Sequence, residues 1–106
     1  MVLLDTRNRL IAIETVYVGS LNLSLVRVGE LFKAAIQRNA ASLILAHNHP
    51  SGDPTPSDAD IRMTRDLIRA GQLLKIQVID HVILGYRTVE RPRDFSSLRE
   101  LGFFYD

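Results

Sequence analysis

Two histidines and one aspartate stand at a spacing that could hold a metal ion. His47 and His49 lie two residues apart, directly after the apolar segment Ser42 to Ala46. If that segment is a strand that continues through them, both imidazoles point to the same face of the sheet. Asp60 follows eleven residues after His49, across a loop with three prolines, in the first turn of an expected helix. These three side chains are the candidate metal ligands.

The donor set determines which chemistry such a site would support. Two imidazole nitrogens and one carboxylate leave the fourth position of tetrahedral zinc open to water, as in catalytic zinc sites. Bound zinc activates water and polarises a carbonyl near neutral pH, so amide hydrolysis is the natural reaction. The chain has no cysteine, so any metal must be held by histidine and carboxylate. We expect one zinc ion, although these donors also suit iron, nickel or cobalt.

Ser57, three residues before Asp60, has two interpretations. Its hydroxyl could donate a hydrogen bond to a developing oxyanion, which makes it the candidate catalytic residue. Ser57-x-x-Asp60 also resembles a capping box that only satisfies helix amides, and taken alone this interpretation is stronger. The pair Asp80-His81 could orient a ligand or could be a strand-end pair, so we leave both residues outside the site.

Composition narrows the classes of protein. A chain of 106 residues is one domain, and 46% hydrophobic with 24% charged residues is ordinary for a globular protein. No apolar run approaches the roughly 18 residues of a membrane span and no signal-peptide pattern is present, so we expect a cytoplasmic protein without a membrane partner. The net charge of +1 does not argue for nucleic acid. Arg62, Arg65 and Arg69 could contact phosphate, but charges at this spacing usually form a solvated helix face.

Periodicity and turn residues predict an α/β domain. The expected elements, in chain order, are strands at Val2 to Leu4 and Leu10 to Val18, a helix at about Val28 to Asn39, a central strand at Ser42 to Ala46, a helix from Ser57 to about Gln72 with Gly71 near its end, a strand at Ile76 to Leu84, and a short helix at Asp94 to Leu101.

The run from His47 to Asp60 resembles a known motif. It reads HNHPSGDPTPSDAD, which is similar to the JAMM motif in its RadC-type version: His-x-His, seven residues, Ser, two residues, Asp. The similarity to RadC-like JAB/JAMM (MPN+) proteins extends over nearly the whole chain, including Leu4 to Asn8 and Ile79 to Gly85. It implies a cytidine-deaminase-like JAB/MPN sandwich, with a mixed β-sheet and flanking helices. It also implies zinc held by the same three candidate ligands, with Ser57 stabilising the transition state.

The chain departs from the family pattern at its start. JAMM enzymes use an upstream glutamate as general acid/base, which we would expect a few residues before Leu4, where this chain has no room for it. Glu14 is the nearest upstream carboxylate, but its position does not match. RadC-like proteins usually also carry a helical, helix-hairpin-helix-like region before this domain. We therefore expect residues 1–106 to be the C-terminal JAB/JAMM part of a longer protein.

Three hypotheses of different classes follow. The first is a zinc-dependent metallopeptidase, a class that includes isopeptidases, acting on an unidentified peptide or protein. The second is a DNA-repair or recombination accessory protein of the RadC type, whose JAMM domain is a binding module. The third is a non-catalytic interaction domain, which the intact ligand set disfavours. The sequence determines neither the substrate nor the oligomeric state.

Overall fold

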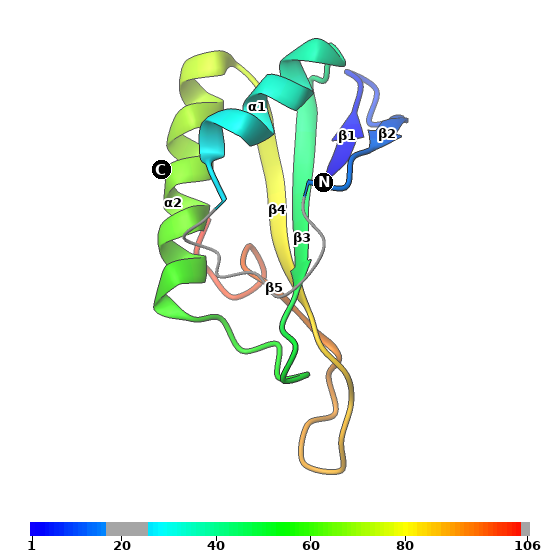
Figure 1. Cartoon of the computed structure of the whole chain (residues 1–106), viewed down its shortest axis with the longest axis vertical. Coiled ribbons are helices and arrows are strands. Elements are labelled where there is room, and N and C mark those ends of the chain that lie inside the picture. Colours follow the sequence, from blue (N-terminus) through cyan, green and yellow to red (C-terminus); the bar gives the residue numbers. More distant parts are fainter. Residues whose placement is uncertain (17–25, 105–106) are drawn as a thin grey trace.

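One mixed β-sheet with two helices makes up the described chain. The computed structural model describes residues 1–16 and 26–104. Its elements are β1 (Val2–Leu4), β2 (Leu10–Ile13), α1 (Val28–Gln37), β3 (Ser42–Asn48), α2 (Asp58–Leu74), β4 (Gln77–Leu84) and β5 (Phe95–Ser97). The strand order across the sheet is β2-β1-β3-β4-β5 (Figure 1). The predicted fold class, an α/β domain with a mixed sheet and flanking helices, is confirmed.

The centre of the sheet is the parallel pair β3 and β4. α2 connects these two strands, as parallel strands require, while β1, β2 and β5 add antiparallel neighbours at the sides. The strand predicted at Ser42 to Ala46 is therefore central, as expected, and it continues to Asn48. Because the strand continues, His47 lies within it, and its side chain points to the same face of the sheet as those of Leu43 and Leu45.

Both helices pack on one face of the sheet. Leu43 and Leu45 lie on that face of β3 and are buried, whereas Ala46 lies on the other face and is exposed. α1 contributes Leu31 and Phe32 to the same core. The other core residues are Met1, Leu3, Ala35, Ala40, Met63, Leu67, Ile76 and Val78. The helices therefore cover one face of the sheet.

Local sequence explains where α2 begins and ends. Ser57 is its N-cap and forms a capping box with Asp60, and Lys75 ends the helix in the left-handed conformation with φ of 59°. Gly71 is buried within the last turns, where an added Cβ would lie 2.5 Å from the Ile76 carbonyl oxygen, so a larger residue would not fit without a shift. The helix ends at Leu74, two residues beyond the predicted end.

The predicted helix at Asp94 to Leu101 is wrong. Phe95–Ser97 instead forms β5, paired antiparallel with Val82 to Leu84, and only a turn follows. The Leu98 amide donates to the His81 carbonyl oxygen at 3.0 Å. Pairing with the free edge of β4 thus overrides the weak local preference of the segment.

Three other boundaries differ from the prediction. β4 begins at Gln77 rather than at Ile76. β2 ends at Ile13 rather than at residue 18, and residues 17 and 18 lie outside the described residues. α1 ends at Gln37, two residues before the predicted end. Among the described residues, neither helix is long and apolar enough to cross a membrane.

Candidate metal centre

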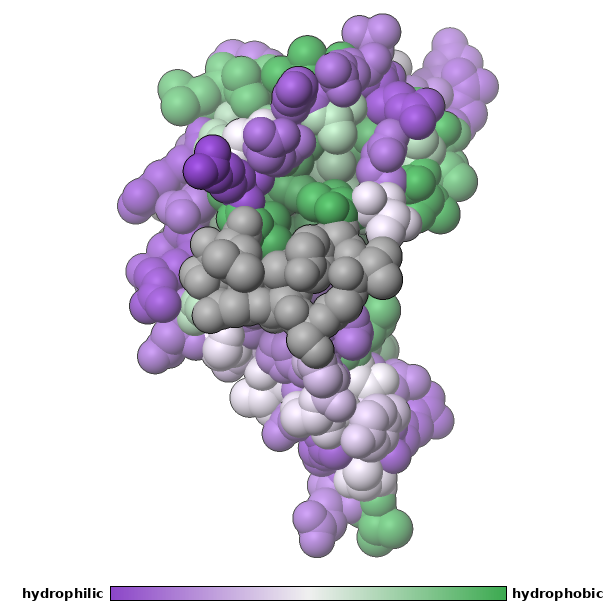
Figure 2. Space-filling model, viewed as in Figure 1, coloured by the Kyte–Doolittle hydropathy of each residue, from purple (hydrophilic) through white to green (hydrophobic). Residues whose placement is uncertain are grey.

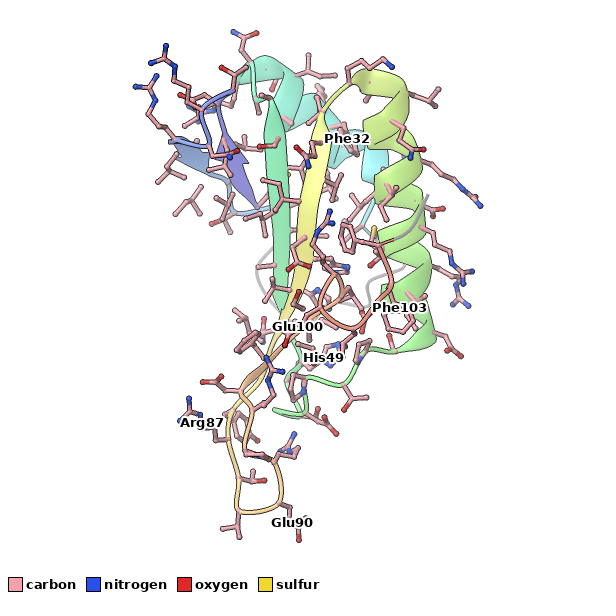
Figure 3. All side chains as sticks on the ribbon, turned by 180° about the vertical axis from the view of Figure 1, so that it is seen from behind. Phe32, His49, Arg87, Glu90, Glu100 and Phe103 are labelled. Atoms are coloured by element: carbon pink, nitrogen blue, oxygen red, sulfur yellow. The ribbon has the colours of Figure 1, made fainter. Side chains whose placement is uncertain are left out.

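The three predicted ligands meet where the two parallel strands end. His47 is near the end of β3, His49 follows directly after it, and Asp60 lies in the first turn of α2. Figure 3 shows His49 below the two central strands, next to the loop that leads into α2. The carboxyl ends of parallel strands commonly form the ligand-binding crevice of α/β sheets. The topology therefore places this cluster where such folds build sites.

One carboxylate faces both imidazoles. His47 Nε2 lies 3.1 Å from Asp60 Oδ1, and His49 Nε2 lies 3.0 Å from Asp60 Oδ2. One donor atom from each residue lies within 4.8 Å of the others. Asp60 is only 2% exposed, while the two histidines are partly exposed. The structure thus brings all three predicted ligands together, with the carboxylate beneath and the imidazoles open to solvent.

Asp60 also caps α2, so the alternative interpretation of its motif holds as well. Its Oδ2 accepts a hydrogen bond from the Ser57 amide at 2.7 Å, and its own amide donates to Ser57 Oγ at 3.1 Å. Capping and facing the histidines are compatible because a carboxylate has lone pairs on both oxygens. The capping box fixes the carboxylate in place for the imidazoles. Ser57 itself is exposed at the helix N-terminus, and its catalytic role stays a prediction.

Burial and hydrogen bonding set the charges of the cluster. Burial lowers the pKa of His47 below its ordinary value, and the attraction of Asp60 only partly opposes this effect. Burial would raise the pKa of Asp60, but hydrogen bonds from Ser57 and the nearby His47 and His49 outweigh it and hold the pKa below its usual value. At neutral pH the cluster therefore contains a neutral His47 and an ionised carboxylate, the forms that bind metal ions.

The loop after His49 is held by glycines and by β4. His49 Nδ1 lies 2.8 Å from the Asp53 carbonyl oxygen, which fixes the ring orientation. Gly52 adopts φ of 83° and its carbonyl accepts the Tyr86 amide at 2.9 Å. A Cβ on Gly85 would lie 2.2 Å from the Gly52 carbonyl oxygen, so the close approach of loop and strand requires glycine there. The loop that carries His49 is thereby fastened to the end of β4.

Two further residues extend the cluster inward. His81 on β4 is fully buried, and its Nε2 lies 3.0 Å from His47 Nδ1. Its Nδ1 lies 2.8 Å from Oγ1 of Thr64, which is also fully buried, one turn after Asp60. Burial, together with repulsion from His47, lowers the pKa of His81 to about 4, so this ring is neutral. His81 belongs with the cluster, whereas sequence reasoning had left it outside and had missed Thr64.

A bulge in β4 explains why His81 reaches His47. The pairing with β3 shifts between Leu43 and Ile44, so that His81 lies opposite Leu45. Without the extra residue His81 would lie opposite Ala46 and point to the other face. Asp80, its neighbour, points away and contacts the Ser97 hydroxyl. The side chains of Asp80 and His81 therefore lie on different faces of the sheet.

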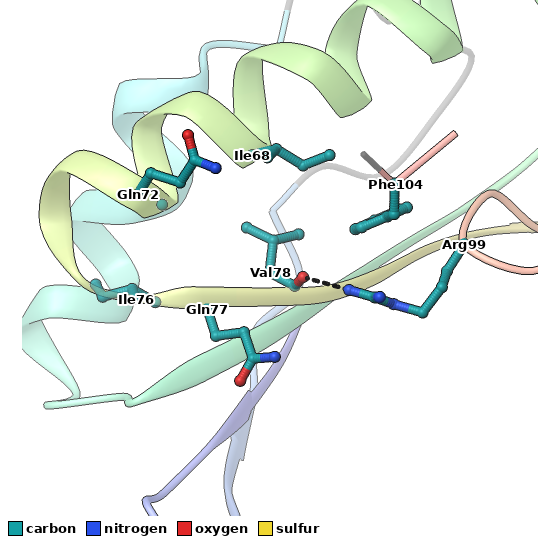
Figure 4. Close-up of a pocket in the computed structure, with 8 residues that line it drawn as sticks. Ile68, Gln72, Ile76, Gln77, Val78, Arg99 and Phe104 are labelled. Carbon is teal, nitrogen blue, oxygen red and sulfur yellow. Dashed lines mark hydrogen bonds between the residues drawn. The ribbon is translucent and has the colours of Figure 1, made fainter. Parts of the chain in front are cut away.

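Two other features are candidates for a site. Glu14 lines the same hollow of about 220 Å³ as His47, but it pairs with Arg38 at 2.8 Å and is absent from the group of described residues that could share a metal ion. A hollow of about 330 Å³ lies between α2 and the start of β4, where Arg99 donates to the Val78 carbonyl oxygen (Figure 4). Its lining contains none of the three candidate ligands.

An α/β domain with a mixed sheet and a His-x-His…Asp cluster at its parallel strands is consistent with a JAB/MPN-type domain. A family model described as "RadC-like JAB domain" matches residues 1–103. The chain therefore belongs to the RadC-like JAB domain family.

The chain is also similar to curated proteins. A UPF0758 protein of Roseiflexus castenholzii is 56% identical over 102 residues, covering 96% of this chain and 41% of that protein. A UPF0758 protein of Chloroflexus aurantiacus is 53% identical over 105 residues, covering 99% of this chain and 43% of that protein. One of Caldanaerobacter subterraneus is 58% identical over 104 residues, covering 98% and 42%. The chain thus spans about two-fifths of the length of these relatives.

Proposed function

We propose that this domain binds one zinc ion through His47, His49 and Asp60 and serves as the catalytic domain of a metallopeptidase. The observation that carries the proposal is the convergence of two imidazole Nε2 atoms on the two oxygens of one buried carboxylate, at 3.1 and 3.0 Å. Nitrogen and carboxylate donors in this number leave a coordination position open, as catalytic sites do.

The hydrogen bond at His49 Nδ1 is evidence for a cation in the cluster. A carbonyl oxygen can only accept, so His49 Nδ1 must carry the proton that it shares with the Asp53 carbonyl at 2.8 Å. In the neutral ring, Nε2 then presents a lone pair to the Asp60 carboxylate. A lone pair facing an anion at 3.0 Å is repulsive unless a cation lies between them. Protons on the two rings could bridge these contacts one by one, whereas a single metal ion satisfies both histidines and the carboxylate together.

Each residue of the cluster would have a role of its own. A bound zinc ion would act as a Lewis acid that polarises the scissile carbonyl and activates water. Asp60 and the two imidazoles hold it, and the capping box keeps the carboxylate in place. Ser57 Oγ accepts the Asp60 amide and has no acceptor for its own proton among the described residues, so it can donate to a developing oxyanion.

A peptidase assay tests this proposal. The protein and its His49→Ala variant are incubated with a library of fluorogenic peptides and isopeptide-linked substrates, with and without a chelator. Cleavage should disappear in the chelator and in the variant while circular dichroism shows that the fold persists. The Leu73→Ala variant is the matched control, because Leu73 is 83% exposed and remote from the cluster in sequence. Cleavage that persists in the chelator would refute a metallopeptidase.

A second candidate is a DNA-binding accessory role of the RadC type. Arg62, Arg65 and Arg69 are exposed on α2, and none of them forms an ion pair with another described residue. Figure 2 shows that the outer side of α2 is largely hydrophilic. If this face contacts phosphates, DNA affinity falls steeply with salt and drops further when the three arginines are replaced by glutamine. Binding that ignores both changes would remove this candidate.

A further inference from the structure

A chain of hydrogen bonds runs from the core to the candidate metal ligand His47. Thr64 Oγ1 donates to the Asp60 carbonyl oxygen at 3.0 Å and lies 2.8 Å from His81 Nδ1. His81 Nε2 in turn lies 3.0 Å from His47 Nδ1. Thr64 and His81 are fully buried, so water cannot replace these contacts. Each member must therefore find its donor or acceptor within the chain.

The direction of the first bond fixes the protons of the others. A hydroxyl has one proton, and in this arrangement Thr64 donates it to the Asp60 carbonyl oxygen. Oγ1 must then accept from His81 Nδ1–H, which leaves His81 Nε2 as an acceptor in the neutral ring. His47 donates to it through Nδ1–H, and its own Nε2 carries a lone pair that faces Asp60. This is the tautomer that a metal ligand needs.

The same three residues allow a second arrangement with the same protons. If the Thr64 hydroxyl turns towards His81 Nδ1, then His81 donates through Nε2–H and His47 carries its proton on Nε2. That proton would point at Asp60 Oδ1, 3.1 Å away, and block the nitrogen that faces the metal position. No net charge changes between the two arrangements; only the tautomers of the two rings differ.

We infer that Thr64 and His81 are positioning residues that hold His47 in the metal-binding tautomer. This inference rests on the proposed metal site and adds to it the residues that decide whether His47 can bind. In the metal-competent arrangement the Thr64 hydroxyl makes two hydrogen bonds, to the Asp60 carbonyl and to His81, and in the blocked arrangement it makes only the one to His81. Removing the hydroxyl therefore costs the metal-competent arrangement about one hydrogen bond more than it costs the blocked arrangement.

Two substitutions of Thr64 separate this role from packing. Thr64→Val keeps the shape and the methyl group but loses the hydroxyl. Thr64→Ser keeps the hydroxyl and loses the methyl group, so it is the more severe change for packing. A structural role predicts that Ser impairs the site more than Val, whereas the tautomer role predicts the opposite order.

Zinc affinity and imidazole tautomers are the readouts. We expect Thr64→Val to weaken zinc binding about fivefold, the value of one neutral hydrogen bond, and Thr64→Ser to bind like the wild type. His81→Phe removes the acceptor for His47 altogether and should weaken binding about 10- to 100-fold, as the loss of such partners does in other sites. Affinities are measured by competition with a chromophoric zinc chelator. Long-range ¹H–¹⁵N spectra of the zinc-loaded wild type should show His81 protonated on Nδ1.

The outcomes separate this inference from the proposed function. A wild-type protein that binds no zinc refutes the metal site itself, and the inference falls with it. A wild type that binds zinc while Thr64→Val and His81→Phe bind equally well refutes the inference alone. So does a Thr64→Ser variant that binds more weakly than Thr64→Val, or a zinc-loaded protein in which His81 is protonated on Nε2.

Discussion

Acidifying the metal-free protein should destabilise it, and the fully buried His81 should contribute a distinct part of this loss. Burial in the core lowers its pKa from 6.5 to about 4. Between these values the unfolded chain binds a proton at this residue and the folded protein does not, so stability rises with pH. The contribution is complete above about pH 6.5 and is lost as the pH falls to 4. The difference of about 2.5 pKa units corresponds to about 3 kcal/mol at most.

The loss should already be measurable well above pH 4. By linkage, His81 alone costs about 2 kcal/mol of unfolding free energy between pH 7.5 and pH 5. Urea denaturation of chelator-treated protein at half-unit pH steps measures this slope. The His81→Phe variant is the control, because it should be less stable overall but should lose the part of the slope that belongs to His81.

Two results would refute this reasoning. One is an equal pH slope in the wild type and in the His81→Phe variant between pH 7.5 and pH 5. The other is an NMR titration in which the His81 ring protonates near 6.5 in the folded protein. Either would show that the ring is hydrated or paired in a way that its complete burial and its two hydrogen bonds contradict.

The remaining predictions concern the cap, the loop and the core. Ser57→Ala should lower the unfolding free energy by about 1 kcal/mol through the lost cap. Zinc affinity should stay within a few-fold, while peptidase activity falls about 10²- to 10³-fold. Gly85→Ala should cost about 1–3 kcal/mol and weaken zinc binding, because its Cβ would lie 2.2 Å from the Gly52 carbonyl oxygen; denaturation and zinc titration check both effects. Leu67→Ala should cost about 2–5 kcal/mol in urea denaturation, whereas Leu73→Ala, at an 83% exposed position, should cost less than about 0.5 kcal/mol.

The sequence predicts much of the cluster because its spacing is local. His47 and His49 are separated by one residue on a strand, and the capping motif ties Asp60 to Ser57 at the start of the next helix. Short-range periodicity and one loop therefore suffice to predict that these side chains meet. The apolar run in β3 likewise predicts a central strand. It also predicts cover on both faces, but the helices pack on one face and Ala46 on the other is exposed.

The inner part of the cluster depends on long-range pairing that no local pattern encodes. His81 reaches His47 only because a bulge shifts the register of β4 against β3 after Leu43. A shift of one residue reverses the face of every side chain, so sequence alone leaves the orientation of His81 open. β5 was missed for the same reason: its pairing with β4 is a tertiary interaction, and the local sequence of Phe95–Ser97 does not require it.

The most direct test of the account is the metal content of the purified domain. Native mass spectrometry and elemental analysis are applied to the wild type and to the His47→Ala/His49→Ala double variant, both checked for folding by circular dichroism. The account predicts near-stoichiometric zinc in the wild type and its loss in the variant. A folded wild type that takes up no metal even after zinc is added would contradict it, and would leave Asp60 as a helix cap beside two structural histidines.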